Sequence, residues 1–277
     1  MKKLNFSRRK YWASVLVLGG VVLVLAMLGT SPTRTRAQEQ EGVNGDKDAQ
    51  VIDTNSVAYG KTFSEWSAQW NQWADSIPVA QHPLFDNGDC SVGQSGPVWF
   101  LGGKFCGGGN CISYTVVRTC NLPSGKALYF PVIDYEDSAL EQSVNEHPGV
   151  EAYQQIGTLR SVTSGIEGAS GLSCEIDHKP IPHFPERFSV QSTAFGFTLP
   201  TDNLFAAMYP PPNNNFEAGT YFPGVDDGYY VMLAPLPPGN HTLHFTAGTW
   251  LDITYHLNVA RESEPSVPPA ATVLKRR

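Results

Sequence analysis

Acidic residues stand at three points where extended segments are predicted to end. Asp134, Glu136 and Asp137 follow the apolar run 128–133, Asp202 follows Pro200, and Asp226 and Asp227 precede Gly228. Carboxylates that meet in space could bind calcium through their oxygens or serve as the acid and base of a glycosidase. Loops at strand ends often carry binding groups. The candidate ligand-binding residues are therefore Asp134, Glu136, Asp137 and Asp202.

Turn chemistry offers another explanation for the same residues. Asp before Gly is an ordinary turn former, so Asp226, Asp227 and Gly228 are interpreted as a turn. For Asp134 and its neighbours, a solvated turn stays open as the alternative to a site. Asp134 and Glu136 are two apart in an extended run and are predicted to point to the same side.

Histidines near the C-terminus form a second candidate site. If segments 241–247 and 250–259 pair as a hairpin, His244 shares a polar face with Asp252 and His256. This trio could bind a divalent metal ion or act as a base with its carboxylate. Solvent-facing polar residues of a strand give the same pattern, so both interpretations stay open.

Recognisable catalytic motifs are missing from the sequence. It has no G-x-S-x-G elbow, no H-E-x-x-H pair and no phosphate-binding glycine loop followed by lysine. The sequence therefore leaves open whether the protein is an enzyme. No cofactor is expected, apart from calcium at the acidic residues.

The five cysteines predict two disulfide bonds. Cys106 and Cys111 enclose a glycine-rich segment predicted to be the tip of a hairpin between strands at 98–101 and 112–118. Cys90 and Cys120 flank that hairpin and form the second predicted pair. Cys174 is left unpaired, and its strand pattern points it inward.

The N-terminus has the features of an export signal. Five basic residues lie between Lys2 and Lys10, ahead of an uncharged run from Trp12 to Leu28. Ser7–Tyr11 also resembles the twin-arginine pattern, but we favour a general secretory signal whose basic segment contains adjacent arginines. An uncleaved membrane anchor at residues 12–28 stays open as well. Each alternative places the rest of the chain outside the cytoplasm, where disulfides form.

Charge excludes some classes of partner. Of the 19 Lys and Arg residues, seven lie in residues 1–37, which hold no acidic residue. The remainder has 12 basic and 26 acidic residues, a net charge of −14. Such a surface repels nucleic acid and anionic lipid, and it attracts cations and basic partners.

The predicted organisation is one globular domain with loose ends. We expect an export signal or anchor at residues 1–37, a flexible lead-in at 38–57, a single β-rich domain at 58–260 and a disordered tail at 261–277.

One helix is clear within the domain. Thr62 and Glu65 form a capping box, and Phe63, Trp66, Trp70 and Trp73 recur on one helical face. We interpret this tryptophan stripe as core that packs on a sheet, with sugar stacking as the alternative. A second helix is predicted at 150–166.

Strands account for most of the remaining domain. They are predicted at 127–133, 172–176, 187–195, 229–233, 241–247 and 250–259, in addition to the two that flank Cys106 and Cys111. The fold class is therefore mainly β, an antiparallel β-sandwich of immunoglobulin-like or jelly-roll type.

The segments 236–245 and 252–259 resemble the last strands of bacterial immunoglobulin-like and fibronectin-like sandwiches. Together with 96–101 and 123–131, they also resemble a group of secreted bacterial proteins with no assigned activity. The resemblance would cover about residues 58–260. It implies a fold and a location, and it transfers no catalytic residue.

Two functions of different class remain. The first is a non-catalytic exported module that binds a glycan, a surface polymer or a cell-surface protein. The second is an exported polysaccharide hydrolase with a carboxylate pair. The first is the expectation, because the chain combines a sandwich pattern and many aromatic residues with no nucleophile motif.

Overall fold

The first long element is helix α1, Phe63–Ser76, which follows a short hairpin of β1, Val57–Ala58, and β2, Lys61–Thr62. At its start, Glu65 N donates to Thr62 Oγ1 over 3.3 Å and Thr62 N donates to Glu65 Oε2 over 2.8 Å. These two bonds are the predicted capping box. The computed structural model describes residues 49–105, 114–144, 155–209, 211–212 and 214–261. The export signal and the tail beyond residue 261 lie outside them.

Two five-stranded sheets form the body of the molecule. The first has the order β3–β5–β10–β8, with β9 also paired to β10. Its strands are β3, Val98–Phe100; β5, Ala127–Ser138; β8, Ser189–Gln191; β9, Phe195–Leu199; and β10, Gly219–Leu233.

The second sheet has the order β4–β12–β11–β6–β7. Its strands are β4, Tyr114–Leu122; β6, Leu172–Ile176; β7, Lys179–Pro180; β11, Gly239–Ala247; and β12, Leu251–Val259. The predicted C-terminal hairpin is present, because β11 and β12 pair antiparallel along their whole length. Ile253, Tyr255 and Leu257 are buried on one face of β12, as the alternation predicted.

The structure corrects one expectation about strand direction and one about strand pairing. Both sheets are mixed, because β3 runs parallel to β5 and β4 runs parallel to β12. The predicted hairpin between the strands at 98–101 and 112–118 is wrong, because β3 and β4 belong to different sheets. β3 pairs with β5 and β4 pairs with β12 instead, and both partners lie further away along the chain. The sequence pattern shows that a strand exists, but it does not show its partner.

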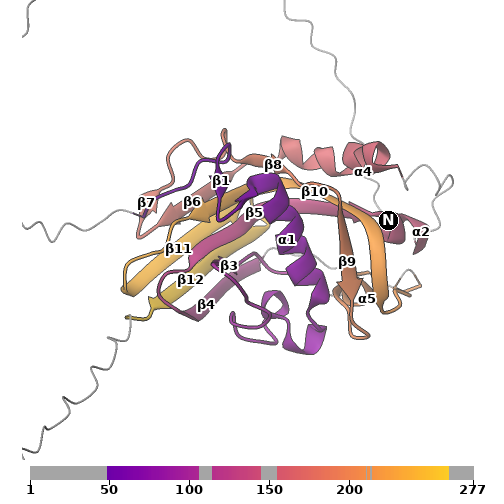
Figure 1. The fold of residues 1–277 in the computed structure, drawn as a ribbon, viewed down its shortest axis with the longest axis horizontal. Coiled ribbons are helices and arrows are strands. Elements are labelled where there is room, and N and C mark those ends of the chain that lie inside the picture. The colour runs from indigo at the N-terminus through magenta and orange to yellow at the C-terminus, as the bar shows by residue number, and fades with distance from the viewer. Residues whose placement is uncertain (1–48, 106–113, 145–154, 210, 213, 262–277) are drawn as a thin grey trace, which may run out of the picture. The chain divides into compact units, whose positions relative to one another are not determined.

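The molecule has three layers. Helix α1 lies across one face of the first sheet, and the second sheet covers the other face (Figure 1). Trp66, Trp70 and Trp73 are each no more than 6% exposed and pack on Phe100, Tyr129 and Tyr230 of the first sheet. The interpretation of the tryptophan stripe as core is confirmed.

The remaining helices in the described part of the chain are short. They are α2, Ala139–Val144; α4, Ile156–Thr163; α5, Leu204–Met208; and the 3₁₀ turns η1, Val79–Gln81, η2, Pro83–Phe85, and η4, Ser164–Gly168. α4 and η4 match the C-terminal part of the helix predicted at 150–166. Within these described residues, no helix combines the length and apolar character needed to cross a membrane.

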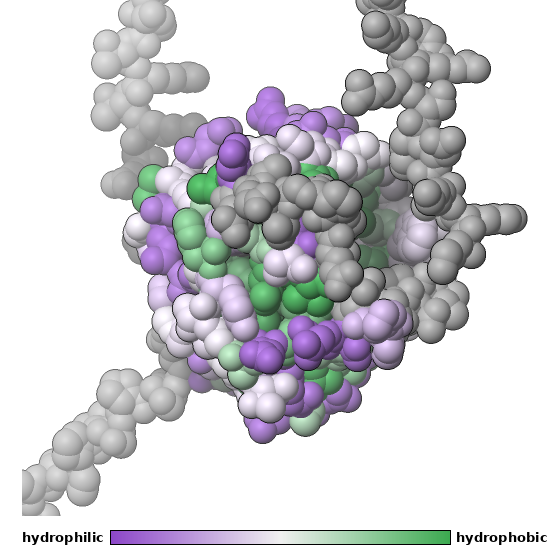
Figure 2. All heavy atoms as spheres, turned by 90° about the vertical axis from the view of Figure 1, so that its right-hand side faces the viewer, coloured by the Kyte–Doolittle hydropathy of each residue, from purple (hydrophilic) through white to green (hydrophobic). Residues whose placement is uncertain are grey.

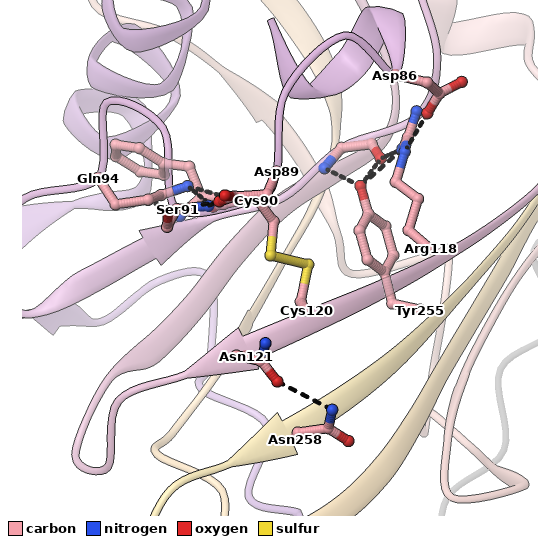
Figure 3. The surroundings of a disulfide bond; sticks show 12 residues. Asp86, Asp89, Cys90, Ser91, Gln94, Arg118, Cys120, Asn121, Tyr255 and Asn258 are labelled. Carbon is pink, nitrogen blue, oxygen red and sulfur yellow. Dashed lines mark hydrogen bonds and ion pairs between the residues drawn. A yellow bond between two sulfur atoms is a disulfide. The ribbon is translucent and has the colours of Figure 1, made fainter. Parts of the chain in front are cut away.

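A disulfide and an arginine connect the layers at one end of the sheets (Figure 3). Cys90 is bonded to Cys120 at the end of β4, which confirms that pair. Arg118 on the same strand donates to the carbonyl oxygens of Gly102 and Gly103, and to Tyr255 Oη over 2.7 Å. Cys174 is free and buried, as predicted. The predicted pair Cys106–Cys111 lies outside the described residues.

Replacing Trp70 tests the core interpretation. Trp70→Ala should lower the free energy of unfolding by about 3–5 kcal/mol, because it removes a large buried ring. The matched control is Trp250→Ala, since Trp250 is 59% exposed. Denaturant titrations of both variants provide the measurement. Equal, small effects in the two would show that Trp70 is not part of the core.

Cysteine chemistry gives a second test. Peptide mapping without reductant should recover Cys90 joined to Cys120 and, if the prediction for the undescribed segment holds, Cys106 joined to Cys111. Burial raises the pKa of the Cys174 thiol, so Cys174 should resist alkylation until denaturant is added. Rapid labelling of Cys174 in the native protein would contradict this placement.

Candidate functional site

The acidic residues after position 133 are part of a strand. β5 does not end at Ile133, as expected, but continues to Ser138, because β10 pairs with it along this whole stretch. Asp134 lies opposite Gly228, and Glu136 lies opposite Asp226. Directly opposed residues share one face of a sheet. The strand therefore presents Asp134, Glu136 and Asp226 on a single face.

Helix α1 covers that face. Ser67 Oγ donates to Asp226 Oδ2 over 2.5 Å, and Tyr230 Oη donates to the same oxygen over 2.8 Å. Ser67, Asn71 and Asp75 recur every four residues of α1 and are all buried. They form a polar row beside the tryptophan stripe. The sequence reasoning selected the tryptophans of this helix and missed Asp75.

A pocket of about 260 Å³ opens between these elements. Four carboxyl groups line it: Asp75 from α1, Asp134 and Glu136 from β5, and Glu141 from α2. Trp70, Phe105 and Tyr209 contribute aromatic walls. We call this the carboxyl pocket. Figure 2 shows the face to which α2 and α5 contribute, where hydrophobic surface lies in a hollow bordered by hydrophilic residues.

Hydrogen bonding leaves part of the carboxyl pocket unsatisfied. Glu141 accepts from Tyr209 Oη over 2.8 Å and from Ser138 Oγ over 2.9 Å. In contrast, neither carboxyl oxygen of Asp75 has a hydrogen-bond partner among the described residues, although Asp75 is only 1% exposed. Glu136 Oε1 is buried without a partner as well. Unpaired buried carboxyls are costly, and they persist mainly where function needs them.

Electrostatics raises the pKa of each carboxyl in this group. Burial is the largest cause of the raised pKa in the four carboxyls of the pocket and in the neighbouring Asp226. It raises the pKa of Asp134 and of Glu141 to about 7. Burial and then the neighbouring carboxylates hold the pKa values of Asp75, Glu136 and Asp226 well above their usual range. No ion pair joins these five groups to a basic side chain in the described part of the chain. The carboxyls of this pocket are therefore expected to hold their protons to a higher pH than ordinary carboxyls do.

Gly228 explains why Asp134 fits here. A Cβ atom at Gly228 would lie 2.8 Å from Cβ of Asp134 and 2.8 Å from the carbonyl oxygen of Ile133, so only glycine at this position allows β10 to approach Asp134 this closely. The interpretation of Asp226, Asp227 and Gly228 as a turn is wrong, because all three lie inside β10. Asp227 points to the opposite face, where its Oδ1 lies 3.2 Å from Arg160 Nη1 of α4.

Two of the predicted ligand-binding residues lie outside the carboxyl pocket. Asp137 alternates to the other face of β5, and its Oδ1 accepts from Gln142 Nε2 over 2.6 Å. Asp202 is exposed, and its Oδ2 accepts from Ala80 N over 2.8 Å. The structure thus brings together Asp134 and Glu136 of the predicted set and adds Asp75, Glu141 and Asp226.

The histidine candidates lie on the outer face of the second sheet. His244 Nε2 lies 2.9 Å from Asp252 Oδ1, and His244 Nδ1 lies 3.5 Å from Glu175 Oε1. His256 is exposed and lies opposite Thr242. Among the residues that the structure describes, no three or more His, Cys, Asp or Glu side chains are arranged to hold a metal ion. Metal binding at His244, Asp252 and His256 stays a prediction.

Comparisons with known proteins do not assign a family or a fold to the chain. No family model matches the chain, and no curated protein matches it. A solved structure described as PbICP-C in complex with falcipain-2 contains a chain that is 12% identical. That alignment covers 59% of this chain and 99% of the other, with a TM-score of 0.22. A similarity this low carries no argument, so the functional conclusion has to come from the carboxyl pocket.

Titration of the carboxyl pocket should appear in the stability of the fold. The pKa of Asp134 is raised from 3.8 to about 7, so its stabilising contribution is full below the lower value and is lost as pH rises through the higher one. We expect Asp134→Asn to flatten the decline in melting temperature between about pH 5 and pH 8. Thermal melts across this range provide the measurement. The control Asp202→Asn should keep the wild-type profile, and an unchanged profile in Asp134→Asn would contradict the placement.

Proposed function

We propose that this protein is an exported, non-catalytic binding protein whose carboxyl pocket holds one residue of a glycan. The observation that carries the proposal is Asp75, whose carboxyl is buried at the pocket and has neither oxygen hydrogen-bonded to a described residue. Sugar hydroxyls would supply the missing donors, because each hydroxyl both donates and accepts. Export is supported by the N-terminal sequence and by the Cys90–Cys120 disulfide.

The size and walls of the pocket favour a single sugar ring. Its volume of about 260 Å³ is below the ~300–1,000 Å³ of pockets that enclose drug-sized ligands. Phe105 and Tyr209 are only partly buried and provide aromatic surface beside the carboxyls. Aromatic faces next to hydrogen-bonding groups suit a ring with one apolar side. We also propose, as a separate point, that the two sheets form a sandwich of immunoglobulin-like type.

A second candidate is the polysaccharide hydrolase. It is favoured by Asp134 and Glu136, which line one pocket and have raised pKa values, as a general acid requires. A glycosidase also needs an ionised partner about 5–9.5 Å from that acid. Every carboxyl of this group has a raised pKa and none has a basic partner among the described residues, so the geometry supports binding better than hydrolysis.

Glycan binding and hydrolysis can be tested with the same variants. On a glycan array, the wild-type protein should retain a defined set of glycans, and Asp75→Asn and Glu136→Gln should weaken retention by about tenfold or more, since each variant replaces a carboxyl oxygen with an amide NH2 group that cannot accept a hydrogen bond. Asp202→Asn, outside the pocket, should bind like wild type. Incubation with the retained glycans should release no reducing ends. Their release by wild type, lost in Glu136→Gln, would establish the hydrolase instead.

Calcium is the remaining expectation for the acidic residues. If Asp134 and Glu136 bind it, calcium at about ten times its dissociation constant should stabilise the fold by roughly 1.4 kcal/mol. Differential scanning fluorimetry with and without calcium tests this, with Asp134→Asn as the matched control. No shift in wild type would remove calcium from the proposal.

A further inference from the structure

The carboxyl pocket has an unbalanced charge. Five acidic groups affect one another there: Asp75, Asp134, Glu136, Glu141 and Asp226. Lys104 is the basic side chain in the described lining, and it forms an ion pair with Asp86. A neutral sugar would satisfy hydrogen bonds in this pocket but would bring no positive charge to favour the ionised form of its carboxyls.

Unpartnered oxygens mark where a compensating group would bind. Both oxygens of Asp75 and Oε1 of Glu136 are buried, accept no hydrogen bond among the described residues and belong to side chains that line the pocket. An ammonium group has three N–H donors and a positive charge. It would satisfy several of these acceptors and neutralise part of the negative charge at the same time.

Building on the proposed function, we propose that the bound sugar residue carries a free amine, and that its ammonium group lies between Asp75 and Glu136. The ligand class is therefore an amino sugar with an unsubstituted nitrogen. Phe105 in the same lining is only partly buried and adds an aromatic ring, and aromatic faces attract cations. The net charge of −14 outside residues 1–37 attracts a cationic glycan over longer distances.

Proton release accompanies this binding. The carboxyls hold protons in the absence of ligand, and an ammonium group favours their ionised forms, so protons leave as the ligand binds. Affinity should rise with pH from about 5 to about 7, because fewer protons must then be displaced. The titratable and charged groups in the described lining of the pocket are Asp75 on α1; Asp134, Tyr135 and Glu136 on β5; Glu141 on α2; Tyr209 after α5; and Lys104. Tyr129, Asp226 and Tyr230 are not part of the lining, and nearby carboxyls contribute to the raised pKa of each of them.

The test uses the full chain and three sets of oligosaccharides: β-1,4-linked glucosamine, its N-acetylated form and β-1,4-linked glucose. Isothermal titration should show the glucosamine oligomer binding at least about tenfold more tightly than the other two, since only it has the charged donor. Titration in two buffers of different ionisation enthalpy should reveal the released protons. Asp75→Asn and Glu136→Gln should lose the preference, while Asp202→Asn should keep it.

The possible outcomes separate this inference from the proposed function. Equal affinity for all three oligomers would overturn the amine and leave glycan binding standing. Failure of all three, together with an empty glycan array, would overturn both. Stabilisation by calcium alone, lost in Asp75→Asn and without amine binding, would overturn the amine in favour of an inorganic cation. The comparison among oligomers needs only the wild-type protein, so it decides the question even if Asp75→Asn does not fold.

Discussion

The packing of α1 against the first sheet is the interaction on which the rest of this structure depends. Trp66, Trp70 and Trp73 bury large rings against Phe100, Tyr129 and Tyr230, and this contact fixes the rotation of the helix about its axis. Once the rotation of a helix is fixed, the directions of the side chains beside the packed face are fixed as well. Ser67, Asn71 and Asp75 are therefore carried into the interior beside the tryptophans, although polar residues at those positions would otherwise face water.

Burial of this polar row gives the carboxyl pocket its chemistry. Ser67 satisfies one oxygen of Asp226, while Asp75, one turn beyond Asn71, has no hydrogen-bond donor among the residues that the structure describes. The stability gained from the aromatic contacts offsets the desolvation of several carboxyls that would be costly in a less tightly packed protein. Protonation is how such groups reduce that cost when no cation is near, and it makes the pocket sensitive both to pH and to positively charged ligands.

Much of the architecture could be predicted from local pattern. The capping box at Thr62, the tryptophan stripe and the alternation in β12 each depend on residues close in sequence, and each was confirmed. The Cys90–Cys120 pair was also predicted, although its supposed reason, a hairpin between them, was wrong. Strand partners and strand lengths were missed, because pairing depends on residues far away in the chain. β5 extends past Ile133 only because β10 continues beside it.

The sequence by itself determined the helix with its buried face, the mainly β composition, and the position of Asp134 and Glu136 on one side of an extended segment. The export signal remains a prediction from the sequence. Tertiary structure alone decided that these two carboxyls meet Asp75, Glu141 and Asp226, which come from three other elements. Asp75 illustrates the difference. In the sequence it is one polar residue near the end of an amphipathic helix, and only the packing of α1 on the sheet removes it from water and places it among other carboxyls. The raised pKa of Asp75 therefore depends on the residues around it in space, which are separated from it by tens of residues along the chain.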